Sequence, residues 1–133
     1  MLPADHDLLE IAEGLLARTY FEGKHEVAAA LRSADGAVHV GVHVGASARR
    51  PSICAEGAAV GAALAAGDRL DIEAIVAVQY KPAGVFRVIA PCGSCRELIS
   101  DYAPDARVYA WDDGEVVCVR AIDLLPYKTR RAW

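Results

Sequence analysis

The sequence predicts an α/β fold in which helices cover parallel strands and a β-hairpin lies at one edge of the sheet. Three patterns lead to this prediction: an amphipathic helical stretch near the N-terminus, strictly alternating valines at residues 38–44, and a strand–helix–strand–helix–strand order after them. The chain has 133 residues. We therefore expect one domain, residues 1–133, around one hydrophobic core.

The first part of the chain is predicted to form a helix followed by the hairpin. Apolar side chains recur at helical spacing in residues 6–21. Residues 27–31 and 38–44 each alternate between the two faces of a strand, and the turn sequence SADG lies between them.

The middle of the chain is predicted to contain a second helix and a buried strand. Pro51 or Ser52 can open the helix, and Gly67 ends it. Residues 70–80 have a nearly continuous apolar run, which indicates a central strand buried on both faces. A turn at residues 81–84 follows.

The last part of the chain is predicted to form one more helix and two more strands. Residues 85–90 read as a short extended piece, and Pro91 opens a helix through residue 102. Two strands around the turn DDG, a helical turn and a tail then follow at residues 106–111, 115–120, 121–126 and 127–133.

Composition and charge exclude several classes of protein. The chain is 54% apolar and 24% charged, as in ordinary globular proteins, and its net charge of -4 lacks the basic surplus that nucleic-acid binding requires. No uncharged apolar run reaches the ~18 residues of a membrane span. Since the N-terminus also lacks the pattern of a secretion signal, we expect a cytoplasmic protein without nucleic-acid or membrane partners.

Three of the four cysteines have a spacing that suggests a metal site. Cys92 and Cys95 stand at i and i+3, a common half-site for zinc, and Cys54 lies at the predicted start of another helix. Helix N-termini favour thiolate over thiol. Three thiolates leave one position of tetrahedral zinc open, as in catalytic sites, where the ion lowers the pKa of a water molecule.

Glu56 is the candidate proton carrier beside such a site. It follows Cys54 by two residues, and in a regular helix the two side chains would point roughly 200° apart, so spacing alone does not fix the geometry. The residues leave three other readings open: a redox CxxC pair, two disulfides, or a closed zinc module with Cys118 as fourth ligand. Cys118 alternates within EVVCVR and is expected to be a core thiol.

The sequences CAE and PCGSC resemble the cytidine deaminase superfamily, in its small Cys-ligated branch that includes blasticidin-S deaminase. The likeness covers residues 27–126, including VAAALRSADGAVHVGVHV, CRELISDYAPDARVYAWDDGE and IDLLP. It implies a three-layer αβα sandwich with a five-stranded mixed sheet, a homotetramer and a role in pyrimidine salvage. It also implies Zn²⁺ bound by Cys54, Cys92 and Cys95, proton transfer by Glu56, and main-chain contacts to the substrate's amino or oxo group at Ala55, Ala90 and Pro91.

The chain departs from that family on the sugar side of the substrate. Where typical members have the Asn and Glu of NIENAS, this chain has His43 and Gly45, and His25 stands at the position of a ring-stacking Phe. A hydroxyl that loses its partner can cost about 1–3 kcal/mol. Arg49 and Arg50 are candidates to receive an acidic group of the substrate.

Two further expectations come from the same comparison with the family. Members usually have an Arg after the catalytic Glu to offset thiolate charge, whereas this chain has Gly57, so Arg96 or Arg50 would take over that role. Tyr127 and Trp133 in the tail are candidates to cover the substrate.

The sequence therefore predicts a zinc-dependent hydrolytic deaminase. Its expected substrate is a free cytidine-like nucleoside or other aminopyrimidine with nonstandard sugar-side recognition. The alternatives are an ordinary cytidine or deoxycytidine deaminase and a non-catalytic protein that binds zinc or nucleoside. The presence of Glu56 argues against the last of these, because a binding module needs no proton carrier.

Overall fold

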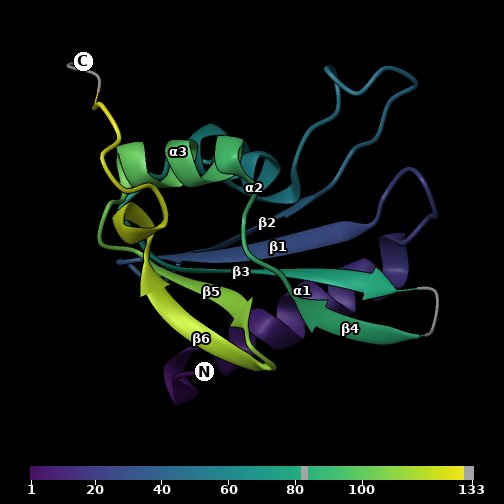
Figure 1. The fold of residues 1–133 in the computed structure, drawn as a ribbon, viewed down its shortest axis with the longest axis horizontal. Helices are drawn as coiled ribbons and strands as arrows, with labels where there is room; N and C mark the ends of the chain where they lie inside the picture. The colour runs from purple at the N-terminus through teal and green to yellow at the C-terminus, as the bar shows by residue number, and fades with distance from the viewer. Residues whose placement is uncertain (82–83, 131–133) are drawn as a thin grey trace.

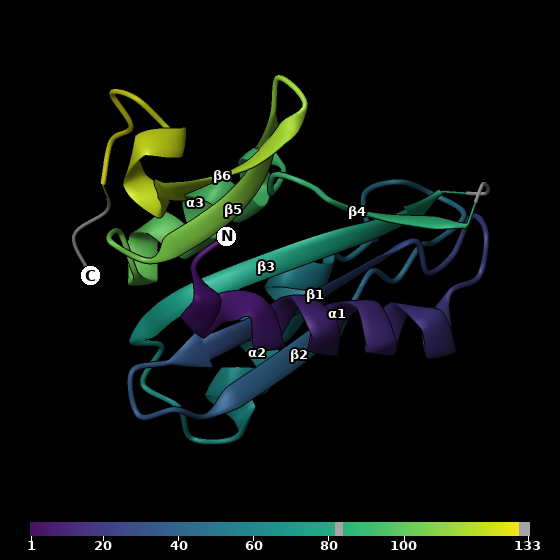
Figure 2. The same ribbon diagram turned by 90° about the horizontal axis from the view of Figure 1, so that it is seen from below.

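The computed structural model describes residues 1–81 and 84–130 and has three layers (Figure 1). Helix α1 (His6–Thr19), preceded by the 3-10 turn η1 (Pro3–Asp5), covers one face of a sheet, and α2 (Ala55–Ala65) and α3 (Gly93–Tyr102) cover the other (Figures 1 and 2). The predicted αβα sandwich is confirmed. In the described ranges, no helix has the length and apolar character needed to cross a lipid bilayer.

The sheet is mixed, and its main path runs in the order β2–β1–β3–β5–β6. Only β3 and β5 pair in parallel among the described strands, so fewer strands are parallel than the helix–strand order suggested. The short extended piece forms β4, which pairs with β3 beside the predicted five-strand path. The strands are β1 (Val27–Ser33), β2 (Val38–Val42), β3 (Ile72–Lys81), β4 (Val85–Val88), β5 (Arg107–Asp112) and β6 (Glu115–Arg120).

Two apolar cores flank the sheet because successive strand residues point to opposite faces. On β1, Ala29 and Leu31 belong to the core beneath α2 and α3, whereas Ala28 and Ala30 pack in the core beneath α1. The middle of β3 is buried on both faces, as its continuous apolar run predicts.

Both helices of the upper layer begin later than the sequence predicts. Val44 and Ile53 form an isolated antiparallel bridge, which keeps the chain extended until Cys54, and α2 begins at Ala55. Before α3, Cys92 is also extended (φ −67, ψ 169), so the helix begins at Gly93 rather than at Pro91. Each helix therefore starts directly after a cysteine, which is its N-cap residue.

The remaining predicted elements agree with the structure apart from their ends. The first helix ends at Thr19, and the predicted C-terminal helical turn is the 3-10 turn η2 (Ala121–Leu124). The predicted turn at residues 81–84 and the predicted tail include residues 82–83 and 131–133, which lie outside the described residues.

Candidate metal centre and its pocket

Three thiols from two helix starts meet at one point on the α2–α3 face. The Sγ atoms of Cys54, Cys92 and Cys95 all lie within 4.8 Å of one another, and those of Cys54 and Cys92 are 3.4 Å apart. Thiolates bound to tetrahedral zinc at ~2.3 Å are about 3.8 Å apart. The spacing of the three sulfurs therefore fits zinc.

The charges around the three thiols favour a bound cation. Burial raises the pKa of Cys95, and the charges of Glu56, Cys54 and Cys92 add to that shift. Burial also raises the pKa of Cys54, and Cys92 and Glu56 add to the shift while a hydrogen bond with Cys95 opposes it. Burial acts in the same direction on Cys92, but the N–H of Cys95 and contacts with the other two thiols lower the pKa of Cys92 overall. Three adjacent thiolates are stable together only around a soft cation, and the N-termini of α2 and α3 add positive potential there.

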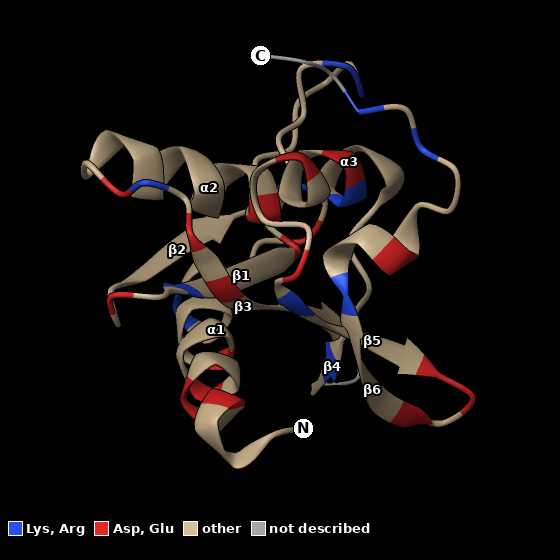
Figure 3. Cartoon of the chain, turned by 90° about the vertical axis from the view of Figure 1, so that its left-hand side faces the viewer, with Lys and Arg blue, Asp and Glu red and all other residues tan. Residues whose placement is uncertain are grey.

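Glu56 is the only charged residue of α2, a helix that is otherwise tan in Figure 3, and its side chain is 4% exposed. Burial raises the pKa of its carboxyl, and hydrogen bonds from its own N–H and from Cys95 oppose that shift only in part. Because Cys54 is extended (φ −70, ψ 149), it does not share the helical register of Glu56. The two side chains therefore line one cavity in spite of their i, i+2 spacing.

The cavity beside the thiols has a volume of about 210 Å³. It joins the metal centre to the ends of β1 and β2 and to the segment before α3. Its lining residues are Glu26, Val27, His43, Cys54, Ala55, Glu56, Ile89, Ala90 and Cys92. Of the substrate contacts expected from the sequence, His43, Ala55 and Ala90 lie here.

His43 is held at the end of the cavity by the segment that leads into β1. Its N–H donates to the carbonyl of Val27 (2.9 Å), and its own carbonyl accepts from Nδ1 of His25 (3.0 Å). Its ring Nδ1 accepts from the N–H of Glu26 (3.2 Å). A neutral His43 ring therefore carries its proton on Nε2. His25 supports His43 but is not among the cavity's lining residues.

Two glycines on this side permit close backbone packing. A Cβ on Gly45 would lie 2.9 Å from the carbonyl oxygen of Gly23, and the Gly45 N–H donates to the carbonyl of Lys24 (2.7 Å). A Cβ on Gly41 would lie 2.3 Å from the backbone nitrogen of Ala59 in α2. The turn before β1 thus fills the space where a side chain at position 45 would begin.

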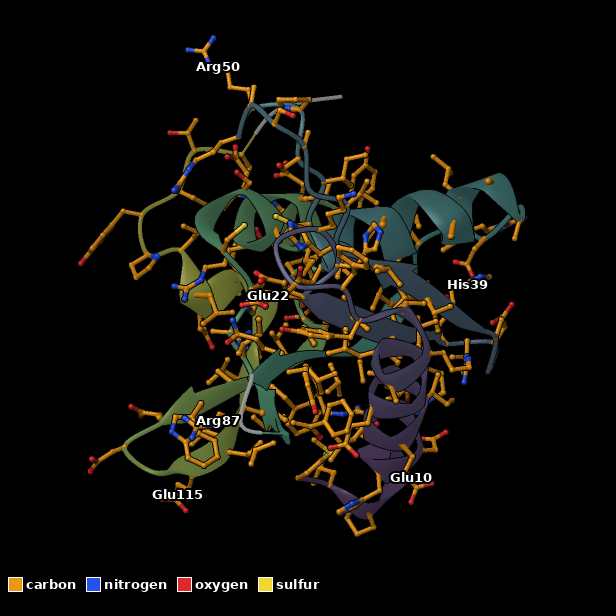
Figure 4. All side chains as sticks on the ribbon, turned by 90° about the vertical axis from the view of Figure 1, so that its right-hand side faces the viewer. Glu10, Glu22, His39, Arg50, Arg87 and Glu115 are labelled. Carbon is orange, nitrogen blue, oxygen red and sulfur yellow. The ribbon has the colours of Figure 1, made fainter. Side chains whose placement is uncertain are left out.

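Several other candidate residues lie away from the cavity. Arg49 and Arg50 lie in the exposed loop between β2 and α2, and Arg50 points away from the body of the molecule (Figure 4). The Pro91 carbonyl accepts from Nε of Arg96 (2.8 Å), so Arg96 is held there. Tyr127 is fully exposed and lines a different hollow beside η2. Trp133 lies outside the described residues.

Cys118 is exposed, which contradicts the expected core position, because it lies on the edge strand β6. It is not part of the thiol cluster, and all four cysteines are free.

Sequence reasoning missed three cavity residues, Glu26, Val27 and Ile89. No motif marks Glu26. It reaches the cavity through the register of β1 against β2, which places its N–H beside the ring of His43. The alternation of β1 does predict that Val27 faces α2 with Ala29 and Leu31.

Comparisons with known proteins agree with this geometry. The model of the family "Cytidine and deoxycytidylate deaminase zinc-binding region" matches residues 3–111. Blasticidin-S deaminase from Bacillus cereus is 39% identical over 131 residues, which are 96% of this chain and 93% of that protein. Cytidine deaminase from Halalkalibacterium halodurans is 32% identical over 105 residues, 77% of this chain and 76% of the relative.

Solved structures extend the likeness to the whole fold. The cytidine deaminase from Burkholderia pseudomallei has a TM-score of 0.79 and 33% identity, over 97% of this chain and all (100%) of that chain. The cytidine deaminase from Mycobacterium leprae has a TM-score of 0.74 and 26% identity, over 95% and 99%. With its three convergent thiols, this chain belongs to the cytidine and deoxycytidylate deaminase family and is a zinc-dependent hydrolytic deaminase that cleaves C–N bonds.

Proposed function

We propose that the chain deaminates a free nucleoside-like aminopyrimidine whose sugar side is recognised without the usual Asn and Glu pair. The observation that carries this proposal is the single cavity that joins two of the three thiols and Glu56 to His43. Bound zinc supplies the Lewis acidity that makes water a nucleophile near neutral pH. Cys54, Cys92 and Cys95 are the residues that would hold it.

The protein's own contribution to the reaction is to move protons and to orient the ring. Glu56 is buried beside the thiols, so its carboxylate can accept a proton from water and deliver it to a ring nitrogen. It can then take the second proton, from the hydroxyl group added to the ring, and deliver that one to the leaving amine. Ala55 and Ala90 bring main-chain groups to the cavity wall, where they can bind the amino or oxo group.

The sugar side supports a nonstandard substrate. A side chain at position 45 would collide with the backbone of Gly23 and Lys24, so no carboxylate can be placed there without moving that turn. His43 offers one N–H donor from a ring held by Glu26. Blasticidin S is the first candidate substrate because the relative at 39% identity, which matches 96% of the chain, bears its name.

Ordinary cytidine or deoxycytidine deamination is the second candidate. The names of the Halalkalibacterium relative and of the Burkholderia structure favour it. In that case His43 alone would replace the usual pair of sugar contacts, and the protein would serve pyrimidine salvage in the cytoplasm.

Ammonia release from a panel of substrates distinguishes these candidates. The panel consists of cytidine, deoxycytidine, cytosine, blasticidin S and aminopyrimidines with acidic groups. We expect kcat/KM for cytidine to be about 5–150-fold below that for the best substrate, since one lost hydrogen bond costs about 1–3 kcal/mol. Equal rates on cytidine and the best substrate would contradict the sugar-side proposal.

Glu56→Gln is the matched catalytic variant. Loss of general acid–base catalysis should lower kcat by about 10²–10⁴ while zinc content stays at one ion per chain. Full turnover by this variant would remove Glu56 from the mechanism. Zinc binding without any turnover by the wild type would instead favour a non-catalytic role.

A homotetramer is part of the same proposal. Helix α2 presents small residues outward, with open space at Gly61, and Leu64 is 59% exposed. Small residues allow helices of neighbouring subunits to pack closely. Light scattering of the zinc-loaded protein measures the mass, and a monomer at micromolar concentration would contradict this part.

A further inference from the structure

The segment between β4 and α3 supplies both a zinc ligand and part of the cavity wall. Ile89 and Ala90 line the cavity together with Cys92. Between the end of β4 at Val88 and the start of α3 at Gly93, the chain belongs to no helix or strand. The position of this segment therefore depends on a few individual hydrogen bonds and not on a helix or a sheet ladder.

Two hydrogen bonds hold the segment on either side of Ala90. The N–H of Ile89 donates to the carbonyl of Ala77 in β3 (3.0 Å). The carbonyl of Pro91 accepts from Nε of Arg96 (2.8 Å). Pro91 is buried, and a buried carbonyl group that lacks a partner costs free energy. The side chain of Arg96 satisfies this carbonyl.

The geometry at the start of α3 explains why a side chain binds there. Cys92 is extended (φ −67, ψ 169), so the carbonyl of Pro91 lies outside the hydrogen-bond ladder of the helix. The first main-chain bond of α3 runs from the N–H of Arg96 to the carbonyl of Cys92 (2.8 Å). The main chain and the side chain of Arg96 therefore bind the two carbonyl groups that flank the Cα atom of Cys92.

The guanidinium of Arg96 is anchored on its other side by the C-terminal segment. Nη1 of Arg96 donates to the carbonyl of Leu124 in η2 (3.5 Å), and η2 lies beside α3 (Figure 1). The N–H of Ala121 in η2 donates to the carbonyl of Ala106 (3.0 Å), which ties η2 to the chain before β5. Within residues 1–81 and 84–130, the hydrogen bonds of this guanidinium go to carbonyl groups and not to thiols.

We infer that Arg96 is a positioning residue of the metal centre, which holds Cys92 through its hydrogen bond to the Pro91 carbonyl and not through its charge. The inference replaces the counter-charge role expected for Arg96, and it does not depend on which substrate the protein deaminates. Sγ of Cys92 lies 3.4 Å from Sγ of Cys54, so a shift of the main chain at Cys92 changes the spacing of the zinc ligands. The same shift would move Ala90 in the cavity wall.

Two substitutions of Arg96 separate the hydrogen bond from the charge. In Arg96→Gln, the amide nitrogen stands as many bonds from the backbone as Nε does, so a donor to Pro91 remains and the charge is lost. In Arg96→Lys, a methylene group stands at that place and the charge remains. We expect Arg96→Lys to bind zinc about 10–100-fold more weakly than the wild type in competition with a chromophoric chelator. Arg96→Gln should stay within about threefold of the wild type, because the 3.5 Å bond to Leu124 that it also loses is weak.

The cobalt-substituted proteins report the geometry of the thiolates without any turnover. Co²⁺ binds the same kind of site as Zn²⁺, and its absorption bands depend on the arrangement of the ligands. The spectrum of Arg96→Gln should coincide with that of the wild type, whereas the bands of Arg96→Lys should shift and weaken. A counter-charge role for Arg96 predicts the opposite order, with Arg96→Lys resembling the wild type.

Lys128→Met is the matched control for a general loss of stability. The Lys128 side chain is 8% exposed, and its Nζ binds Oδ1 of Asp101 and Oγ of Ser100 (both 2.7 Å) near the other end of α3. This variant should lower the unfolding free energy of the zinc-free protein in urea and leave zinc affinity and the cobalt spectrum unchanged.

Three results would overturn the inference: a wild-type zinc affinity and spectrum in Arg96→Lys, equal damage in Arg96→Gln and Arg96→Lys, or an equal loss of zinc affinity in Lys128→Met. The last of these would assign the effect to the stability of α3. No substrate enters these measurements, so the proposed function can fail in the ammonia assay while the role of Arg96 holds.

Discussion

The packing of α2 on β2 predicts that Gly41→Ala damages the metal centre, although Gly41 contributes no ligand. Gly41 faces α2, where an added Cβ would lie 2.3 Å from the nitrogen of Ala59 and 2.4 Å from the oxygen of Ala55. Relaxed carbon contacts need about 3.5 Å, so the helix must move away by about 1 Å. Gly41 is not among the glycines with a positive φ, so an alanine can adopt its backbone conformation. The expected effect of the substitution is therefore a steric clash of the added Cβ with α2.

A shift of α2 changes the distances among the three zinc ligands, because Cys54 is the N-cap residue of α2 and moves with it, whereas Cys92 and Cys95 belong to α3. Zinc–sulfur distances tolerate changes of only about 0.2 Å. We therefore expect Gly41→Ala to weaken zinc binding by about 10–100-fold, as loss of a supporting contact does in other sites. Overpacking at this position should also cost about 1–3 kcal/mol of unfolding free energy.

Competition with a chromophoric chelator measures zinc affinity, and urea denaturation of the zinc-loaded protein measures the unfolding free energy. Gly14→Ala is the control, since position 14 lies in helix α1 on the other face of the sheet, where an added Cβ would meet only Nη1 of Arg18 at 3.7 Å. That variant should bind zinc normally and gain about 0.5–1 kcal/mol from helix propensity. A Gly41→Ala protein with wild-type zinc affinity and stability would refute the reasoning.

Other predictions test the cluster, the sugar side and the N-terminal network. Cys95→Ser should abolish stoichiometric zinc binding, whereas Cys118→Ser, at a thiol outside the cluster, should retain one ion per chain by elemental analysis. Chelation of zinc should lower the melting temperature, since a ligand at a thousandfold its Kd adds about 4 kcal/mol. Gly45→Ala should cost less than Gly41→Ala in urea denaturation, because its Cβ would be 2.9 Å from the nearest atom of an exposed turn. Burial raises the pKa of Asp5, but hydrogen bonds from Arg107, Tyr109 and Arg32 lower it to about 2. Because the pKa of Asp5 is lower in the folded state than in the unfolded state, the unfolding free energy of the wild type should fall by about 2 kcal/mol relative to that of Asp5→Asn as the pH falls from 5 to 2. A constant difference between the two unfolding free energies across that range would contradict this prediction.

The metal centre could be predicted from the sequence because its residues lie in short motifs. CxxC spacing places Cys92 and Cys95 on one side of a helical turn, and a cysteine before an Ala-rich helix suggests the third ligand. The exact helix starts could not be predicted, because the bridge between Val44 and Ile53 is a pairing between distant residues. Because of that bridge, Cys54 lies before the helix, and the side chains of Cys54 and Glu56 line the same cavity.

The sugar end was less predictable because it depends on contacts without a local motif. Position 45 can be recognised as glycine in the sequence, but only the structure shows that the backbone of Gly23 and Lys24 occupies the adjacent space. Arg49 and Arg50 seemed close to the site in the sequence, yet a loop of several residues carries them outward. Sequence distance was a poor guide there because loop geometry is set by tertiary contacts.

The two ends of the cavity differ in what a substitution disturbs. The metal end is built on α2 and α3, whose first turns pack on the buried face of the sheet, so a change there alters both the core and the ligands. The sugar end is built from the turn before β1, where Phe21 is 57% exposed and the contacts to the segment after β2 are hydrogen bonds of the backbone and of the His25 and His43 rings. Substitutions in such a turn cost little stability. Under the proposed function, substrate choice can therefore change at the exposed end, where His25, His43 and Gly45 lie, without loss of the three thiols and Glu56.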